Sequence, residues 1–415
     1  MTGMKIKIST IEKSLIVILL MMQLGYFKLF PGIFQLFAYS FNPKPLQLVY
    51  FVFVLVIVVL GFKWLRNTSK IFWVEIICCI LPAAVNFFIE VNNGMKMGDL
   101  LGYILPFWYV LMAIPLFGLL QSGQWEFDKM IKMLIILTVG SLLIRMLIVL
   151  YYSISGVILF PNIALESAAK NWTRNGRIRV NPSVMSLLLI PISYYWILRY
   201  PKKRLLGIIG IVVGLIYPMY VTQARSMMLY GVITVVVMYL FQNVSEKSRL
   251  LRYFFIIVIF VLILNTKQFN SFLDSFLTSN ETTGGSTSYR LSALAYYGGM
   301  FLKNPVWGNG FTRTVYSGQV IIGHITDIGI VGALYRVGIF IAVFYLIIIG
   351  SGLKQIFKNK SSEIQLLILG CSIAVLLTEI NIDCFVGLYA FSMPFVIAMI
   401  EYYRYEQLKM LKKVV

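Results

Sequence analysis

The sequence predicts an all-helical membrane protein, and three observations support that fold class. Hydrophobic residues make up 59% of the 415 residues and charged residues only 13%, whereas an ordinary soluble domain carries about 25% charged residues. Apolar runs of roughly 17 to 25 residues, long enough to cross a bilayer, recur from end to end. Basic residues gather in short clusters between these runs. We therefore expect a single membrane domain over 1–415 rather than several soluble domains.

The apolar runs define about twelve expected transmembrane helices. They lie at 14–38, 46–62, 71–90, 100–120, 131–153, 182–199, 204–221, 226–242, 251–265, 328–350, 363–381 and 384–402. If the N-terminus is cytoplasmic, every even-numbered connection and the C-terminal tail carries a basic cluster, as the positive-inside rule requires. The sequence therefore predicts that both termini are cytoplasmic. We expect no nucleic-acid partner despite the net charge of +20, because the basic residues are scattered.

Two outer connections depart from this pattern of short, weakly charged loops. The first, about 154–181, contains a basic cluster over Lys170–Arg179. The second, about 266–327, is the longest soluble stretch, and apolar residues recur at helical spacing over Tyr289–Lys303 within it. That spacing predicts an amphipathic helix on the outer membrane surface. A turn rich in proline and glycine should follow it over 304–310.

The predicted outer face carries residue types that could hold a diphosphate and move a proton. They are Arg174, Arg177, Arg179, Arg225, Arg290 and the only histidine, His324. Arginine presents a planar fork of donors that matches phosphate oxygens, and histidine exchanges its proton near neutral pH. Asp327 could orient the imidazole if that stretch is helical. The alternative is that the arginines snorkel to lipid head groups and that His324 is an ordinary loop residue.

Two arginines fall inside expected helices, where a charge normally faces a partner or a wet cavity. They are Arg145 and Arg336, and Glu379 is a candidate counter-ion. Structural pairing is the alternative to a functional role for all three. No P-loop, GxGxxG, HExxH or DxD motif is present, so we expect neither a cofactor nor a metal. A diphosphate leaving group needs positive charge and a base near the attacking hydroxyl rather than a strong general acid.

The order of these features resembles the Wzy and WaaL superfamily of bacterial O-antigen polymerases and ligases. The resemblance covers roughly 170–345 and is carried first by Arg-Asn-Gly-Arg-Ile-Arg-Val-Asn-Pro at 174–182 and Thr-Gln-Ala-Arg-Ser at 222–226. The long outer loop adds Arg290, then Asn-Pro-Val-Trp-Gly-Asn-Gly at 304–310, then His324.

The chain departs from that family at two positions. Ala224 stands where the family often has Ser before its Arg, and Ile325 stands where Asn or Ser usually follows the His. The second departure leaves the partner of His324 open.

The resemblance implies a GT-C-like bundle and a metal-independent glycosyltransferase that acts on the outer face of the membrane. Its donor and acceptor would be undecaprenyl-diphosphate-linked oligosaccharides. Arg225 and Arg290 would hold the donor diphosphate, and His324 would activate the acceptor hydroxyl. The expected substrate-binding residues are Arg174, Arg177, Arg179, Asp327 and Arg336, of which Arg177 or Arg179 would guide the second lipid diphosphate or the glycan.

The leading hypothesis is a polymerase of lipid-linked repeat units in the bacterial cytoplasmic membrane, which would make O-antigen, capsule or exopolysaccharide. One alternative is a ligase that moves glycan onto lipid A core or another final acceptor. Another is a lipid-linked oligosaccharide flippase, which would place its cations in a central cavity. Expected partners are the lipid-linked glycans and membrane lipids, with a chain-length regulator and a flippase as further candidates.

Overall fold

The computed structural model describes residues 7–29, 44–161, 163, 173–174, 177–243, 248, 250–254, 284–311, 316–317, 320–321, 325–354, 362–385 and 389–414. Over these residues the chain is almost entirely helical, so the predicted all-helical class is confirmed. The strands within the described ranges form two short antiparallel hairpins. β1 (Thr173–Arg174) pairs with β2 (Arg177–Ile178), and β3 (Tyr316–Ser317) pairs with β4 (Val320–Ile321).

Most of the helices follow the apolar runs of the sequence. In chain order they are α1 (Ile8–Gln23), α3 (Lys44–Gly61), α4 (Lys70–Asn92), α5 (Met97–Trp108), α6 (Ala113–Gln121), α7 (Phe127–Ser155), α9 (Ser186–Arg199), α10 (Leu205–Tyr220), α11 (Arg225–Phe241), α14 (Gly284–Phe301), α15 (Ile330–Val337), α16 (Ile339–Leu353), α17 (Glu363–Thr378) and α18 (Met393–Val414). Short 3₁₀ helices are η1 (Tyr26–Leu29), η2 (Phe62–Trp64), η3 (Tyr109–Met112), η4 (Pro201–Lys203), η5 (Ile325–Asp327) and η6 (Ala390–Ser392).

Within the described ranges, three stretches are long and apolar enough to cross a membrane: Lys70–Asn92, Leu100–Gln121 and Phe127–Ser155. Six shorter apolar helices accompany them. Large apolar side chains on the outside of the bundle are well exposed, including Phe88 at 65% and Leu346 at 68%. A surface of this kind is typical of contact with lipid rather than with water. The molecule is therefore a helical protein suited to a membrane, and the count of twelve spans stays a prediction.

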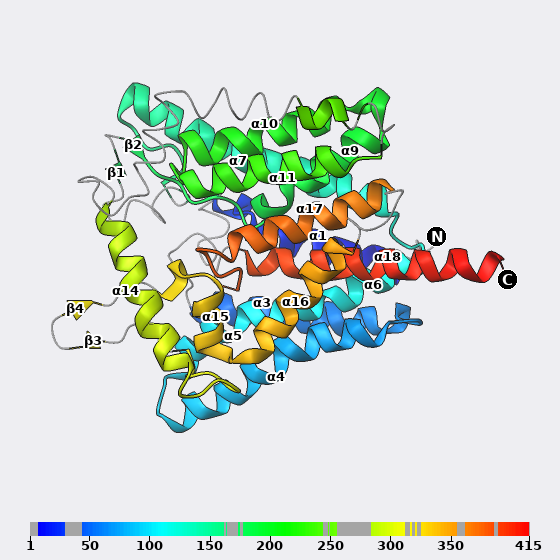
Figure 1. Cartoon of the computed structure of the whole chain (residues 1–415). Helices are drawn as coiled ribbons and strands as arrows, with labels where there is room; N and C mark the ends of the chain where they lie inside the picture. The colour runs from blue at the N-terminus through cyan, green and yellow to red at the C-terminus, as the bar shows by residue number, and fades with distance from the viewer. Residues whose placement is uncertain are drawn as a thin grey trace, which may run out of the picture.

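The two ends of the bundle differ in character. Figure 1 shows most helices side by side along one direction, with α14 crossing one end. The labels of all four short strands lie at that end, which we call the hairpin end. Both chain termini lie at the other end, which we call the terminal end (Figure 1).

The expected helix over 328–350 is divided by the structure into α15 and α16. Gly338 stands at the break with a φ of +72°, which L side chains rarely adopt. The turn over 304–310 fits into the break: the backbone N–H of Ile339 donates to the Pro305 carbonyl at 2.9 Å. A Cβ on Gly338 would press against the Val306 carbonyl. Glycine is therefore required at position 338, because the backbone of the 304–310 turn lies too close to leave room for a side chain.

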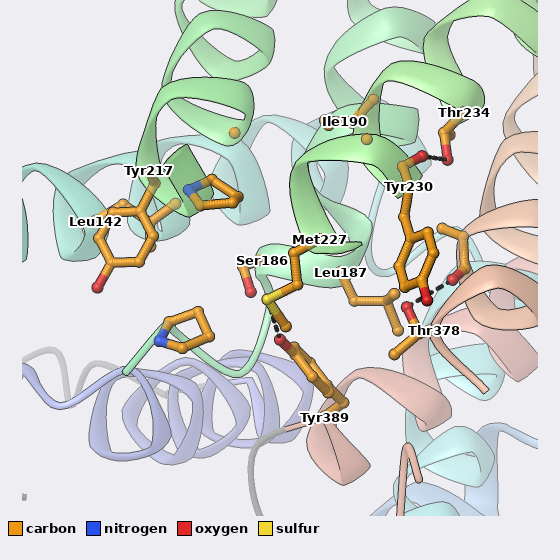
Figure 2. Close-up of a pocket in the computed structure, with 15 residues that line it drawn as sticks. Leu142, Ser186, Leu187, Ile190, Tyr217, Met227, Tyr230, Thr234, Thr378 and Tyr389 are labelled. Atoms are coloured by element: carbon orange, nitrogen blue, oxygen red, sulfur yellow. Dashed lines mark hydrogen bonds between the residues drawn. The ribbon is translucent and has the colours of Figure 1, made fainter. Parts of the chain in front are cut away.

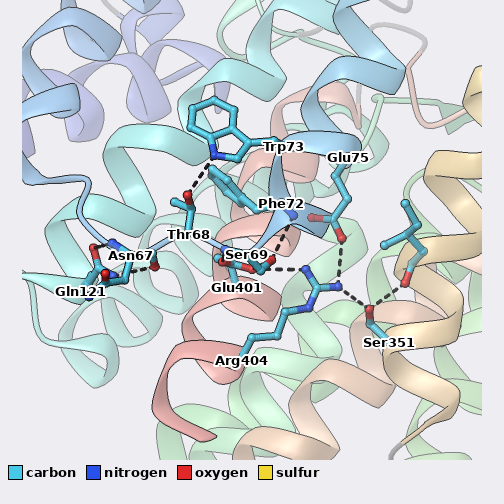
Figure 3. A network of polar contacts seen from close by, with 11 residues as sticks. Asn67, Thr68, Ser69, Phe72, Trp73, Glu75, Gln121, Ser351, Glu401 and Arg404 are labelled. Atoms are coloured by element: carbon cyan, nitrogen blue, oxygen red, sulfur yellow. Dashed lines mark hydrogen bonds and ion pairs between the residues drawn. The ribbon is translucent and has the colours of Figure 1, made fainter. Parts of the chain in front are cut away.

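The terminal end is held together by a buried polar network (Figure 3). Glu75 of α4 is fully buried and lies 3.3 Å from the guanidinium of Arg404 in α18. Arg404 also contacts Glu401 at 3.3 Å and donates to Ser351 of α16 at 2.8 Å. The Ser69 hydroxyl donates to Glu401 at 2.7 Å. Because these buried carboxylates have charged or hydrogen-bonding partners, the network joins α4, α16 and α18.

Candidate functional site

The α14 helix covers the hairpin end and buries one face. Ala293 and Tyr297 are fully buried against Ile325 and Ile328, which lie in and just after η5. Leu291 and Leu302, on the expected apolar face, are instead 55% and 74% exposed. A helix therefore forms in the predicted segment, but only part of the expected apolar face, including Leu294, packs on the protein. The outward leucines remain available to lipid.

Arg290 precedes Ala293 by three residues and so lies near the buried face of α14. Its side chain is half-buried, and its Nε–H has no hydrogen-bond partner among the described residues. The guanidinium interacts electrostatically with Tyr230 of α11, whose hydroxyl is hydrogen-bonded to Ser226. A buried donor without an acceptor is costly unless a ligand supplies one. Arg290 is thus placed to receive an anion beside α11.

The N-terminus of α11 forms the opposite side of this region. Arg225 is its first residue, and the N-cap, Ala224, contributes no side-chain hydrogen bond. The first-turn N–H groups therefore lack a side-chain cap and favour negative charge. Just beyond the first residue, the Ser226 hydroxyl accepts from Asn381 Nδ2 at 3.0 Å. That bond fixes the start of α11 against the connection that follows α17.

The predicted basic outer loop contacts the connection between α10 and α11. Arg179 Nε donates to the carbonyl of Thr222 at 2.7 Å. Arg174 and Arg177 occupy paired positions of the β1–β2 hairpin just before it. Arg179, the start of α11 and Arg290 therefore come from three separate stretches of the chain and lie near one another. A diphosphate-binding role for them stays a prediction.

The predicted base, His324, lies outside the described residues. Asp327 ends η5 and is half-buried. The neighbouring Ile325 and Ile328 hold this segment against α14, on the same helix as Arg290. The stretch that immediately follows His324 is therefore fixed to the helix that carries Arg290.

Arg336 forms an ion pair that the sequence did not reveal. It lies 3.3 Å from Asp383, and both side chains are buried. Asp383 also accepts from the Phe385 N–H at 2.8 Å. Burial raises the pKa of the Asp383 carboxyl, and the Arg336 guanidinium opposes that change. Glu379, the candidate counter-ion, accepts from the Cys384 N–H at 2.6 Å. Arg336 thus fastens α15 to the connection between α17 and η6.

A small pocket lies between α9, α10, α11 and α17 (Figure 2). Its cavity volume is about 60 Å³. Its lining is mainly apolar and aromatic and includes Pro182, Tyr217, Met227, Tyr230 and Tyr389. Tyr230 links the pocket to Arg290, and the Tyr389 hydroxyl closes its lower side by donating to Met227 Sδ at 3.4 Å. The pocket is therefore a small apolar cavity beside Arg290, whose Nε–H has no hydrogen-bond partner among the described residues.

No family model, no curated protein and no solved structure matches this chain.

Proposed function

We propose that this protein is a glycosyltransferase with a GT-C-like bundle of about twelve spans, and that it polymerises undecaprenyl-diphosphate-linked repeat units. The observation that carries the proposal is the buried Nε–H of Arg290, which has no hydrogen-bond partner in the described part of the chain, beside the N-terminus of α11, which has no side-chain cap. Helix N-termini and arginine forks are two common protein ligands for phosphate. Their combination at one end of an apolar bundle supports an amphiphilic diphosphate as the substrate.

The proposed reaction is a displacement at the anomeric carbon of the donor. An acceptor hydroxyl forms the new C–O bond while the bond from that carbon to the diphosphate oxygen breaks. Arg225 and Arg290 stabilise the negative charge on the departing diphosphate. His324 takes the hydroxyl proton, so the products are the lengthened lipid-linked glycan and free undecaprenyl diphosphate.

Two alternatives use the same substrate class. A ligase would share this chemistry and differ only in its acceptor. A flippase would need its cations along a central cavity, whereas Arg179, Arg225 and Arg290 belong to the hairpin end. That distribution favours a transferase over a flippase.

The direct test is to incubate the purified full chain with one lipid-linked repeat unit. A polymerase produces a ladder of lipid-linked products. His324→Ala should lower turnover by about 100-fold to 10,000-fold, because a positioned base contributes that much, while donor binding stays nearly unchanged. Arg199→Gln, a change at the terminal end, is the control. If product forms only on a separate final acceptor, the protein is a ligase rather than a polymerase. If the lipid is translocated without glycan transfer, the protein is a flippase.

A further inference from the structure

A second cavity lies at the terminal end of the bundle, beside the polar network around Arg404 (Figure 3). We call it the terminal cavity. Its walls come from the start of α4, the end of α16, and from α17 and α18. Its volume is about 400 Å³, within the range of about 300–1,000 Å³ that is usual for ligand sites. The apolar part of its lining consists of Ile368, Ile400, Leu408 and Leu411.

The charged residues that line the terminal cavity are Lys354 and Arg404, and its described lining contains no acidic side chain. Arg404 is already neutralised, because its guanidinium pairs with the buried carboxylates of Glu75 and Glu401. Lys354 differs from it, since its side chain is exposed and has no ion-pair or hydrogen-bond partner among the described residues. The cavity therefore has one positive charge that no described residue compensates.

Gln407 adds a neutral donor to the same lining. It follows Arg404 by three residues on α18, is half-buried, and has no side-chain hydrogen bond in the described part of the chain. The ammonium of Lys354 and the amide of Gln407 can both donate to a phosphate, whose oxygens accept several hydrogen bonds. The polar part of the cavity is therefore suited to a phosphate group.

The position of the terminal cavity along the bundle matches a lipid head group. Lys354 is the C-cap of α16, and Ser69, which also lines the cavity, is the N-cap of α4. The cavity thus lies where two apolar helices end, which is the level of the polar groups of a bilayer. Leu408 and Leu411 are 55% and 65% exposed and offer apolar surface to acyl chains. The positive-inside pattern predicts that this end faces the cytoplasm, where the leaflet is rich in anionic lipid.

We propose that the terminal cavity binds an anionic phospholipid of the membrane. Lys354 and Gln407 contact its phosphate, and Leu408 and Leu411 contact its acyl chains. The proposed glycosyl transfer does not use this cavity, because Arg290 and the start of α11 belong to the hairpin end. The lipid site therefore goes beyond that function and does not depend on it.

Native mass spectrometry of the purified full chain tests the proposal by titration with phosphatidylglycerol and with zwitterionic phosphatidylcholine. We expect the first phosphatidylglycerol to bind about tenfold more tightly than the first phosphatidylcholine, because only phosphatidylglycerol brings a net negative charge to Lys354. Lys354→Gln should lower the affinity for phosphatidylglycerol by about fivefold to tenfold, since one cation beside the head group is lost. The side chain of Lys354 is exposed, so this variant should fold as the wild type does.

Leu408→Glu and Met410→Glu are a matched pair of variants. Both side chains belong to α18 and are 55% and 53% exposed, but only Leu408 lines the terminal cavity. Leu408→Glu places a negative charge beside the bound head group and should lower the affinity for phosphatidylglycerol by about fivefold or more. Met410→Glu should lower it by less than about twofold, because solvent screens a charge outside the cavity.

Equal losses in Leu408→Glu and Met410→Glu would overturn the proposal, because only the overall charge of this surface would then matter. Wild-type affinity in Lys354→Gln, or a wild type without preference for phosphatidylglycerol, would also overturn it. Binding is measured without turnover, so an inactive transferase leaves this result unaffected.

Discussion

The arginines within helices differ in which groups accept hydrogen bonds from their guanidinium donors. The sequence could not predict this difference. Arg145, Arg290 and Arg336 are similar in sequence, since each interrupts an apolar or amphipathic run. In the structure Arg336 pairs with Asp383, whereas Arg145 bonds to the Leu24 carbonyl and Arg290 keeps an unpartnered Nε–H among the described residues. The partners are far away along the chain. Sequence patterns reveal a buried charge, but the fold decides which group meets it.

Replacing Arg290 by lysine tests the proposed role of its fork. Arg290→Lys keeps the charge but removes the Nε–H and the planar pair of donors. Losing one hydrogen bond to a charged group costs about 1.5–3 kcal/mol, so turnover should fall roughly tenfold to a hundredfold. The measurement is the rate of product-ladder formation at saturating donor. Arg199→Lys is the control and should keep wild-type turnover. Near wild-type turnover in Arg290→Lys would show that the guanidinium fork of Arg290 has no part in the reaction.

At the scale of elements, several helix positions were predictable, whereas α18 (Met393–Val414) is displaced toward the C-terminus from the expected span at 384–402. Helix continuity was not predictable. The expected spans at 71–90 and 131–153 match α4 and α7 within a few residues, because length and apolarity define them. The expected span at 328–350 contains Gly338, and composition alone does not show that the turn over 304–310 enters there. The buried face of α14 was also missed, because Ala293 and Tyr297 pack on residues from beyond the next loop.

The ion pair between Arg336 and Asp383 should stabilise the junction of α15 with the connection after α17. Asp383→Asn keeps an acceptor for the Phe385 N–H but leaves Arg336 buried without its charge partner. Breaking a buried pair in this way costs about 3–5 kcal/mol. We expect a clear drop in the melting temperature of the purified protein. Adding Arg336→Met should recover most of the loss, and a double variant as unstable as the single one would contradict the pairing.

At the scale of the whole molecule, the two ends of the bundle differ in how their buried charges are partnered. The terminal end carries a polar network around Glu75 and Arg404, in which the buried carboxylates of Glu75 and Glu401 face a cation. The hairpin end carries Arg290, whose Nε–H has no hydrogen-bond partner among the described residues. The positive-inside pattern of the sequence predicts that the terminal end faces the cytoplasm. The proposed chemistry therefore requires the hairpin end to face outward.

Cysteine labelling on intact cells tests that orientation. The four native cysteines, Cys78, Cys79, Cys371 and Cys384, are all buried, so they should give little background. Ser288 of α14 and Lys354 at the end of α16 are both exposed, at opposite ends of the bundle. An impermeant maleimide should label Ser288→Cys on intact cells and Lys354→Cys only after the membrane is opened. The reverse result would put Arg290 on the cytoplasmic side, where a polymerase of exported repeat units would not meet its donor, and the proposed function would fail.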